Sequence, residues 1–183
     1  ELAQIKDVKI FISQLNLFNQ NKIKIKKIII KYANFSIKKN DFEFINNLIN
    51  QKFSSKKIII KNSNIFYKKK NNETISISKI YNLELFLNTK KSLNQVIAKG
   101  KIFKIPFNFK WSKDFTNNNL KKTILKMPKI NLKMFNQSTI SDFKYIADNK
   151  LFIGGTTLIF NYTIEDSVII LKSNNSQLLN DNI

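Results

Sequence analysis

Apolar residues recur at every second position in several segments of this chain, and this period constrains the fold more than any other feature. It appears in residues 74–78 and again in residues 83–87. Successive side chains of a β-strand point to opposite faces, so such a period predicts strands with one buried face. Polar clusters at residues 62–64 and 68–72 separate the apolar segments and indicate turns. We therefore expect an antiparallel meander, with residues 57–61 and 65–67 as two strands on either side of a turn.

The sharpest alternation occupies residues 101–111, where every second residue is apolar or aromatic. We expect one strand there, with an aromatic stripe on one face. Residues 41–51 change to helical spacing, which predicts a short amphipathic helix with Asp41 as its N-cap. We interpret that helix as a cap on the sheet, with a membrane-surface or partner-binding helix as the alternative. Residues 138–150 fit either a short helix or a turn.

A hexapeptide occurs twice in the first third of the chain. Residues 26–31 and 56–61 both read Lys-Lys-Ile-Ile-Ile-Lys, 30 residues apart. A fixed period in this range suggests stacked supersecondary units. We expect repeat units at about residues 22–51 and 52–88, within a single β-rich segment, residues 1–183, of a longer repetitive protein.

The formal charge of +20 invites a nucleic-acid partner, but all 32 basic residues are lysines. Arginine is the favoured residue for bidentate contact with phosphate and guanine. The lysines are spread over every segment, and the abundance of Lys, Asn, Ile and Phe is also what A/T-rich codons produce. We therefore do not expect nucleic acid as the partner. Attraction to an anionic membrane surface follows from the charge in either case.

Few residues here could carry chemistry. The chain has no Cys and no His, so thiolate or imidazole metal sites and a Cys or His catalytic group are excluded. The adjacent pair Glu165 and Asp166 reads as a solvated turn, since catalytic carboxylates need burial and a partner. We expect no enzymatic activity, no metal and no cofactor.

An apolar stripe repeated on strand after strand must be buried against something. One short helix cannot cover a sheet of this size. The options are a β-sandwich, closure into a barrel, or a curved open sheet whose apolar side holds a lipid. We expect a mainly β fold in which an antiparallel meander forms a curved, groove-like sheet with one short amphipathic helix; the alternative is a β-sandwich.

The order of strand, small polar turn, strand, polar tip and alternating strands in residues 57–85 resembles the periplasmic AsmA-like (TamB-type) envelope proteins. Residues 98–107 look like the next strand pair of that architecture, and the resemblance covers about residues 5–111. It implies a segment of a protein anchored to the inner membrane of a Gram-negative cell through a region outside this chain. Such a protein conducts phospholipid along an apolar β-groove between the inner and outer membranes, or supports outer-membrane assembly.

The resemblance implies phospholipid acyl chains, an anionic membrane surface and other envelope proteins as partners. The lining that we predict for the groove consists of the alternating apolar residues Ile75, Ile77, Leu83, Leu85, Leu87, Phe103, Ile105, Phe107 and Phe109.

Two other functions fit the same sequence. A basic β-rich nucleic-acid-binding module is suggested by the lysines interleaved with aromatic residues, which could stack bases. A structural β-sandwich without a ligand is suggested by the default reading of an apolar stripe as core.

Overall fold

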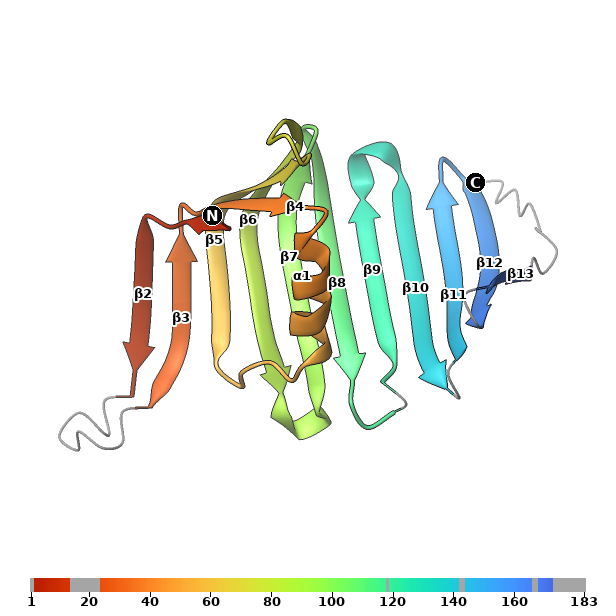
Figure 1. Ribbon diagram of the computed structural model, residues 1–183, viewed down its shortest axis with the longest axis horizontal. Coiled ribbons are helices and arrows are strands. Elements are labelled where there is room, and N and C mark those ends of the chain that lie inside the picture. Colours follow the sequence, from red (N-terminus) through yellow and green to blue (C-terminus); the bar gives the residue numbers. More distant parts are fainter. Residues whose placement is uncertain (1, 14–23, 118, 142–143, 166–167, 173–183) are drawn as a thin grey trace.

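The computed structural model describes residues 2–13, 24–117, 119–141, 144–165 and 168–172 of the 183-residue chain. Within these ranges, thirteen strands form one open, curved sheet that does not close into a barrel, and one α-helix lies against it (Figure 1). The predicted mainly β, open sheet with a single short helix is confirmed. The described strands belong to one sheet, so they do not form the alternative β-sandwich.

The elements follow the chain in this order: β1 (Ala3–Gln4), β2 (Asp7–Ile12), β3 (Ile25–Lys31), β4 (Asn34–Lys38), α1 (Asp41–Asn50), β5 (Lys57–Lys68), β6 (Thr74–Asn88), β7 (Leu93–Ile102), β8 (Ile105–Asp114), β9 (Lys121–Met127), β10 (Leu132–Ser141), β11 (Lys144–Ile153), β12 (Thr156–Glu165) and β13 (Val168–Lys172). Two 3₁₀ turns, Thr89–Lys91 and Pro128–Ile130, join β6 to β7 and β9 to β10.

From β5 to β13 each strand pairs antiparallel with the next one in the chain, which is the predicted meander. The first strands differ, because β3 and β4 both pair parallel with β5. Parallel neighbours need a crossover connection, and α1 with its flanking segments provides it.

The 30-residue offset of the sequence reappears as strand register. Ile28 lies beside Ile58 in the β3–β5 pair, and Phe35 lies beside Ile65 in the β4–β5 pair. The two copies of the hexapeptide are therefore neighbours in the sheet. Residues 22 and 23, the start of the first expected repeat unit, lie outside the described residues.

The turn expected at residues 62–64 does not form, and β5 runs through it as one strand. Asn62 has a φ of 48°, and Tyr32, its counterpart in the first copy, has a φ of 54°. A single residue in the left-handed region bends a strand without ending it, and Asn adopts this conformation more readily than most residues. The turn-forming residues 62–64 therefore bend β5 without reversing its direction.

Residues 74–78 and 83–87 likewise belong to one strand, β6, and not to two. Ile80 lies opposite Gly100 and Asn82 lies opposite Lys99, so Tyr81 is an extra residue in this pair. An extra residue of this kind is a β-bulge, which shifts the side-chain alternation by one position. As a result, side chains of the same parity before and after Tyr81 point to opposite faces.

Three further sequence expectations need correction. The N-cap of α1 is Asn40, while Asp41 begins the helix and its Oδ2 accepts a hydrogen bond from the Lys38 N–H at 2.7 Å. Residues 101–111 are not one strand, because Phe103 and Lys104 have φ values of 48° and 66° and make the two-residue turn between β7 and β8. Where a short helix or turn was expected at residues 138–150, the described residues lie in β10 and β11.

Candidate functional site

One face of the sheet carries an unbroken row of apolar residues from β2 to β12. Side chains that lie directly opposite each other in paired strands share a face, so the strand register identifies the row. We call it the apolar row, and it consists of Val8, Ile30, Ile60, Leu83, Ala98, Phe109, Leu125, Met134, Leu151 and Leu158. The side of the sheet that bears it is the apolar face.

The opposite side, the lysine face, carries most of the strand lysines. Its members in β5 to β11 include Lys57, Lys99, Lys110, Lys122, Lys126, Lys133 and Lys150. Some of these ammonium groups lie over aromatic rings, such as Lys57 over Phe86 at 4.9 Å and Lys150 over Phe152 at 4.9 Å. Most of the strand lysines therefore lie on the face opposite the apolar row, some of them in contact with aromatic rings.

The structure brings six of the nine predicted lining residues together. These six, on β6 and β8, share the apolar face: Leu83, Leu85, Leu87, Ile105, Phe107 and Phe109. Ile75 and Ile77 lie on the lysine face instead, because the bulge at Tyr81 shifts the alternation of β6. Phe103 is at the tip of the β7–β8 turn, with 68% of its surface exposed, and so lies outside the row.

A strap crosses the middle of the apolar face. We define the strap as residues 41–56, which comprise α1 and the segment that leads into β5; Figure 1 shows α1 in front of β7 and β8. The Phe42 ring lies 5.8 Å from that of Tyr67, and the Phe53 ring lies 6.2 Å from that of Trp111. A hollow of about 180 Å³ remains beneath the strap, lined in part by Leu48, Phe53, Ile58 and Leu85.

Two buried polar residues of the sheet hold the strap through its backbone. The Asn94 side chain, fully buried, donates to the Gln51 carbonyl oxygen at 2.7 Å and accepts from the Phe53 N–H at 2.8 Å. The Lys113 ammonium donates to the backbone and side-chain oxygens of Asn50 at 3.1 and 3.2 Å. Burial, together with the nearby charge of Lys121, lowers the pKa of Lys113. Nothing in the alternation of the sequence singled out these two anchors, since a polar residue in a strand ordinarily indicates the solvent side.

Beyond the strap the apolar face is open. In Figure 1 no other helix or strand of the described residues lies over β9 to β12 on this side. Across the described residues, the buried apolar side chains are only Ala33, Ile80, Ala98 and Ala147, three of them small. A sheet with so little core leaves its apolar face available to another apolar surface.

The larger hollows elsewhere on the sheet lie mainly on the lysine face. One of about 360 Å³ crosses β9 to β12, with Lys122, Phe135 and Lys150 in its wall, and another of about 600 Å³ is lined in part by Ile75, Ile77 and Lys101. They are shallow gaps between long side chains on an open surface. The apolar face is the better candidate, because continuity across the strands, more than local depth, suits an elongated apolar ligand.

The chain matches no protein-family model, no curated protein and no solved structure. The resemblance to AsmA-like proteins accordingly stays a prediction. Among the described residues, no helix has the length and apolar character needed to cross a lipid bilayer. Nor do three or more acidic side chains gather within those residues in a way that could hold a metal ion.

Proposed function

We propose that this chain is a segment of a lipid-binding β-groove, whose apolar face holds phospholipid acyl chains while the lysines attract the anionic headgroups. In keeping with the AsmA-like resemblance, the groove would conduct phospholipid between the inner and outer membranes of a cell envelope. The observation that carries the proposal is the apolar row, which is continuous from Val8 to Leu158 and which no described helix or strand covers over β9 to β12.

The physical argument rests on burial. Each methylene group moved from water onto an apolar surface contributes about 0.8 kcal/mol, so an acyl chain laid along several strands gains a substantial free energy. Passive transfer along the row needs no catalytic group, because the lipid only exchanges one apolar surface for the next. The net charge of +20 favours anionic lipids over neutral ones.

The strap limits how lipid would move. It covers the apolar face at β5 to β8 through Phe53 and the anchors Asn94 and Lys113. Acyl chains would therefore bind first on β9 to β12, and passage along the whole row requires the strap to leave the face. In this proposal the open part of the row is the binding site, and the strap separates it from the β2–β3 end.

The aromatic stripe of β8 does not favour the alternative of a nucleic-acid-binding module. A single-strand binder places aromatic rings and positive charges on the same surface, where bases stack and phosphates pair. Here Phe107, Phe109 and Trp111 lie on the apolar face, while Lys110 and Lys126 lie on the lysine face. The rings that do share the lysine face with lysines include those of Phe86 and Phe152. Loss of lipid binding together with strong, salt-sensitive binding of single-stranded DNA would favour that alternative.

Two adjacent residues of β12 provide a matched test. Leu158 belongs to the apolar row and Ile159 to the lysine face, and their exposed fractions are nearly equal at 43% and 45%. We expect Leu158→Gln to weaken the binding of a phospholipid labelled in its acyl chain by several-fold, and Ile159→Gln to leave it unchanged. Circular dichroism of both variants would show that the fold is intact. Equal effects of the two substitutions, or no binding by the wild type, would contradict the proposed function.

A further inference from the structure

The open part of the apolar face is itself divided into an apolar and a polar band. One row of polar residues crosses β8 to β10 on this face and a second crosses β9 to β11, and we call them the polar track: Lys113, Lys121 and Ser138 in the first row, Thr123, Asn136 and Asn149 in the second. Thr123, Asn136 and Asn149 each lie two positions from a member of the apolar row, namely Leu125, Met134 and Leu151. Polar and apolar bands therefore run side by side across the strands.

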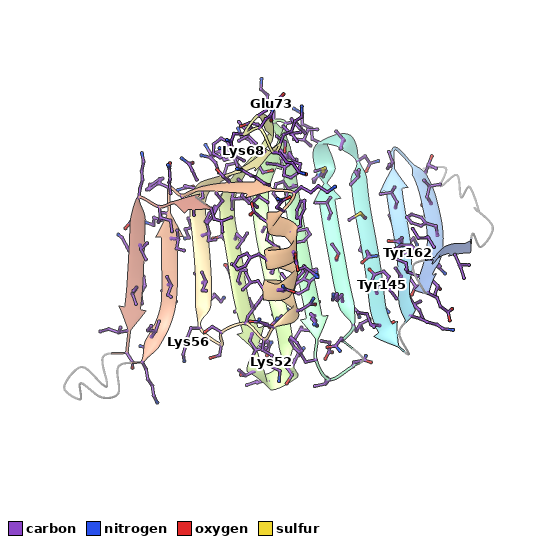
Figure 2. The ribbon with its side chains drawn as sticks, in the orientation of Figure 1. Lys52, Lys56, Lys68, Glu73, Tyr145 and Tyr162 are labelled. Carbon is purple, nitrogen blue, oxygen red and sulfur yellow. The ribbon has the colours of Figure 1, made fainter. Side chains whose placement is uncertain are left out.

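The polar track begins at one rim of the sheet, at the ends of β8 and β9. Lys113 is the next-to-last residue of β8 and Lys121 the first residue of β9, so the track lies where these strands end. The strap brings Lys52 to the same rim, as Figure 2 shows at the lower edge of the molecule. The ammonium groups of Lys52 and Lys113 lie 5.6 and 5.0 Å from the centre of the Phe115 ring.

The two lysines of the polar track have no ion-pair partner among the described residues. Lys113 and Lys121 lie directly opposite each other on neighbouring strands, an arrangement that is destabilising for like charges. The ion pairs among the described residues are Lys57–Glu84, Lys69–Glu73 and Lys144–Glu165, so neither lysine of the track takes part in one. Lys113 hydrogen-bonds only to neutral oxygens of Asn50. An anion placed beside Lys121 would relieve this repulsion.

We propose that the polar track binds the phosphate of a phospholipid whose acyl chains lie on the adjacent apolar row, an inference that rests on the proposed function. Lys121, on β9, supplies the principal charge. Lys121 and Leu125 are four residues apart on β9, about 13 Å along the strand, so headgroup and acyl chain fit on the same strands. The headgroup would then lie at the rim, beside Lys121, and the acyl chains would lie further along the same strands on the apolar row.

Lys122 provides the matched control, because it neighbours Lys121 on β9 but lies on the lysine face. The probes are phosphatidylglycerol and a diacylglycerol with the same labelled acyl chains, which lacks the phosphate. We expect the wild type to bind phosphatidylglycerol more tightly. Lys121→Gln should weaken that binding about fivefold, the equivalent of about 1 kcal/mol for one lysine near an anionic lipid, and leave diacylglycerol binding unchanged. Lys122→Gln, which removes the same charge, should change neither.

The outcomes separate this inference from the function on which it rests. If the wild type binds neither lipid, the proposed function fails and the headgroup site fails with it. If it binds both lipids equally, or if Lys121→Gln and Lys122→Gln have the same effect, only the headgroup site is overturned. Inorganic phosphate added alone is the third arm. If phosphate binds the wild type in a Lys121-dependent way while the two lipids bind equally, the track is a site for a free anion and not for a lipid headgroup.

Discussion

The side-chain amide of Asn64 donates a hydrogen bond to the side-chain oxygen of Asn34 at 2.9 Å, and these two residues occupy equivalent positions 30 residues apart. The bond lies just beyond the bend at which Tyr32 and Asn62 adopt left-handed conformations. Next to it, Ser63 Oγ accepts from the buried Ala33 N–H at 3.0 Å and donates to the Lys61 carbonyl oxygen at 2.9 Å. At the bend these side-chain hydrogen bonds add to two backbone bonds, from the Tyr32 N–H to the Lys61 carbonyl oxygen and from the Asn64 N–H to the Ala33 carbonyl oxygen.

Replacing Ser63 with alanine should destabilise this bend. The Ala33 N–H would remain buried without its acceptor, which costs about 1–3 kcal/mol. Denaturant unfolding monitored by circular dichroism measures the change, with Ser76→Ala, at a less buried serine of β6, as the control. A Ser63→Ala variant as stable as the Ser76→Ala control would show that the hydroxyl is not needed there.

Alanine at position 100 should separate β6 from β7 locally. A Cβ atom on Gly100 would overlap the backbone carbonyl oxygen of Lys79 and press against the Phe107 ring. Because backbone cannot move aside as a side chain can, we expect a loss of at least about 3 kcal/mol in unfolding free energy. Thermal melting measures it, and Lys99→Ala, one position away with an exposed side chain, should have little effect. A normal melting temperature for Gly100→Ala would mean that the two strands pair differently from the register described above.

Substitution of Asn94 by alanine should release the strap from the sheet. It removes both hydrogen bonds to the strap backbone, at Gln51 and at Phe53. Hydrogen exchange of residues 41–56 should accelerate, and more acyl-chain probe should bind once β5 to β8 are uncovered. Gln95→Ala alters the adjacent side chain, which points to the other face, and should do neither. Unchanged exchange in Asn94→Ala would show that Lys113 and the aromatic contacts are sufficient to hold the strap.

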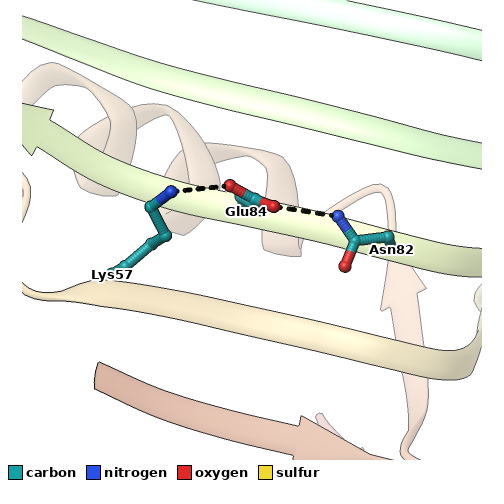
Figure 3. Close-up of polar contacts among 3 residues, drawn as sticks. All are labelled: Lys57, Asn82 and Glu84. Carbon is teal, nitrogen blue, oxygen red and sulfur yellow. Dashed lines mark hydrogen bonds and ion pairs between the residues drawn. The ribbon is translucent and has the colours of Figure 1, made fainter.

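The ion pair between Lys57 and Glu84 predicts a small dependence of stability on pH. Lys57 Nζ donates to Glu84 Oε2 at 3.0 Å and the Asn82 amide donates to Oε1 at 3.2 Å (Figure 3). The hydrogen bond from Lys57 is the main reason why the pKa of Glu84 lies below its ordinary value of 4.5. A lowered carboxyl pKa stabilises the folded state above that ordinary value, and the contribution is lost as the pH falls through the lowered pKa.

We therefore expect wild type to be more stable than Glu84→Gln at pH 7, and the difference to shrink at pH values below 4.5. The effect should stay below about 1 kcal/mol, since the Lys57 and Glu84 side chains are 44% and 26% exposed. Melting temperatures of both proteins over this pH range provide the measurement. A difference that grows on acidification would contradict the assignment.

The alternation of the sequence predicted the two faces of β8 correctly, because its apolar and polar residues separate as Phe109 and Lys110 do, but it missed the turn before Ile105. It could not predict which face Ile75 and Ile77 occupy, since an apolar period contains no information about a bulge at Tyr81. It also failed for β10 and β11, where Asn136 and Asn149 interrupt the apolar pattern. The side-chain amides of Asn136 and Asn149 hydrogen-bond to each other at 2.8 Å. These polar residues therefore lie opposite each other within paired strands and do not form a turn.

Because the described strands form a single layer, the order in which they unfold depends on which strands each one pairs with. Each strand is held by the strands beside it, and only the strap spans several of them. Stability in such a structure is close to a sum of nearest-neighbour terms, like that of a repeat protein, and all-or-none unfolding is not guaranteed. Among the described strands, β13 pairs with β12 alone, so unfolding should start at β13 and continue strand by strand toward the middle of the sheet. The strands held by the strap, β7 and β8, should unfold last.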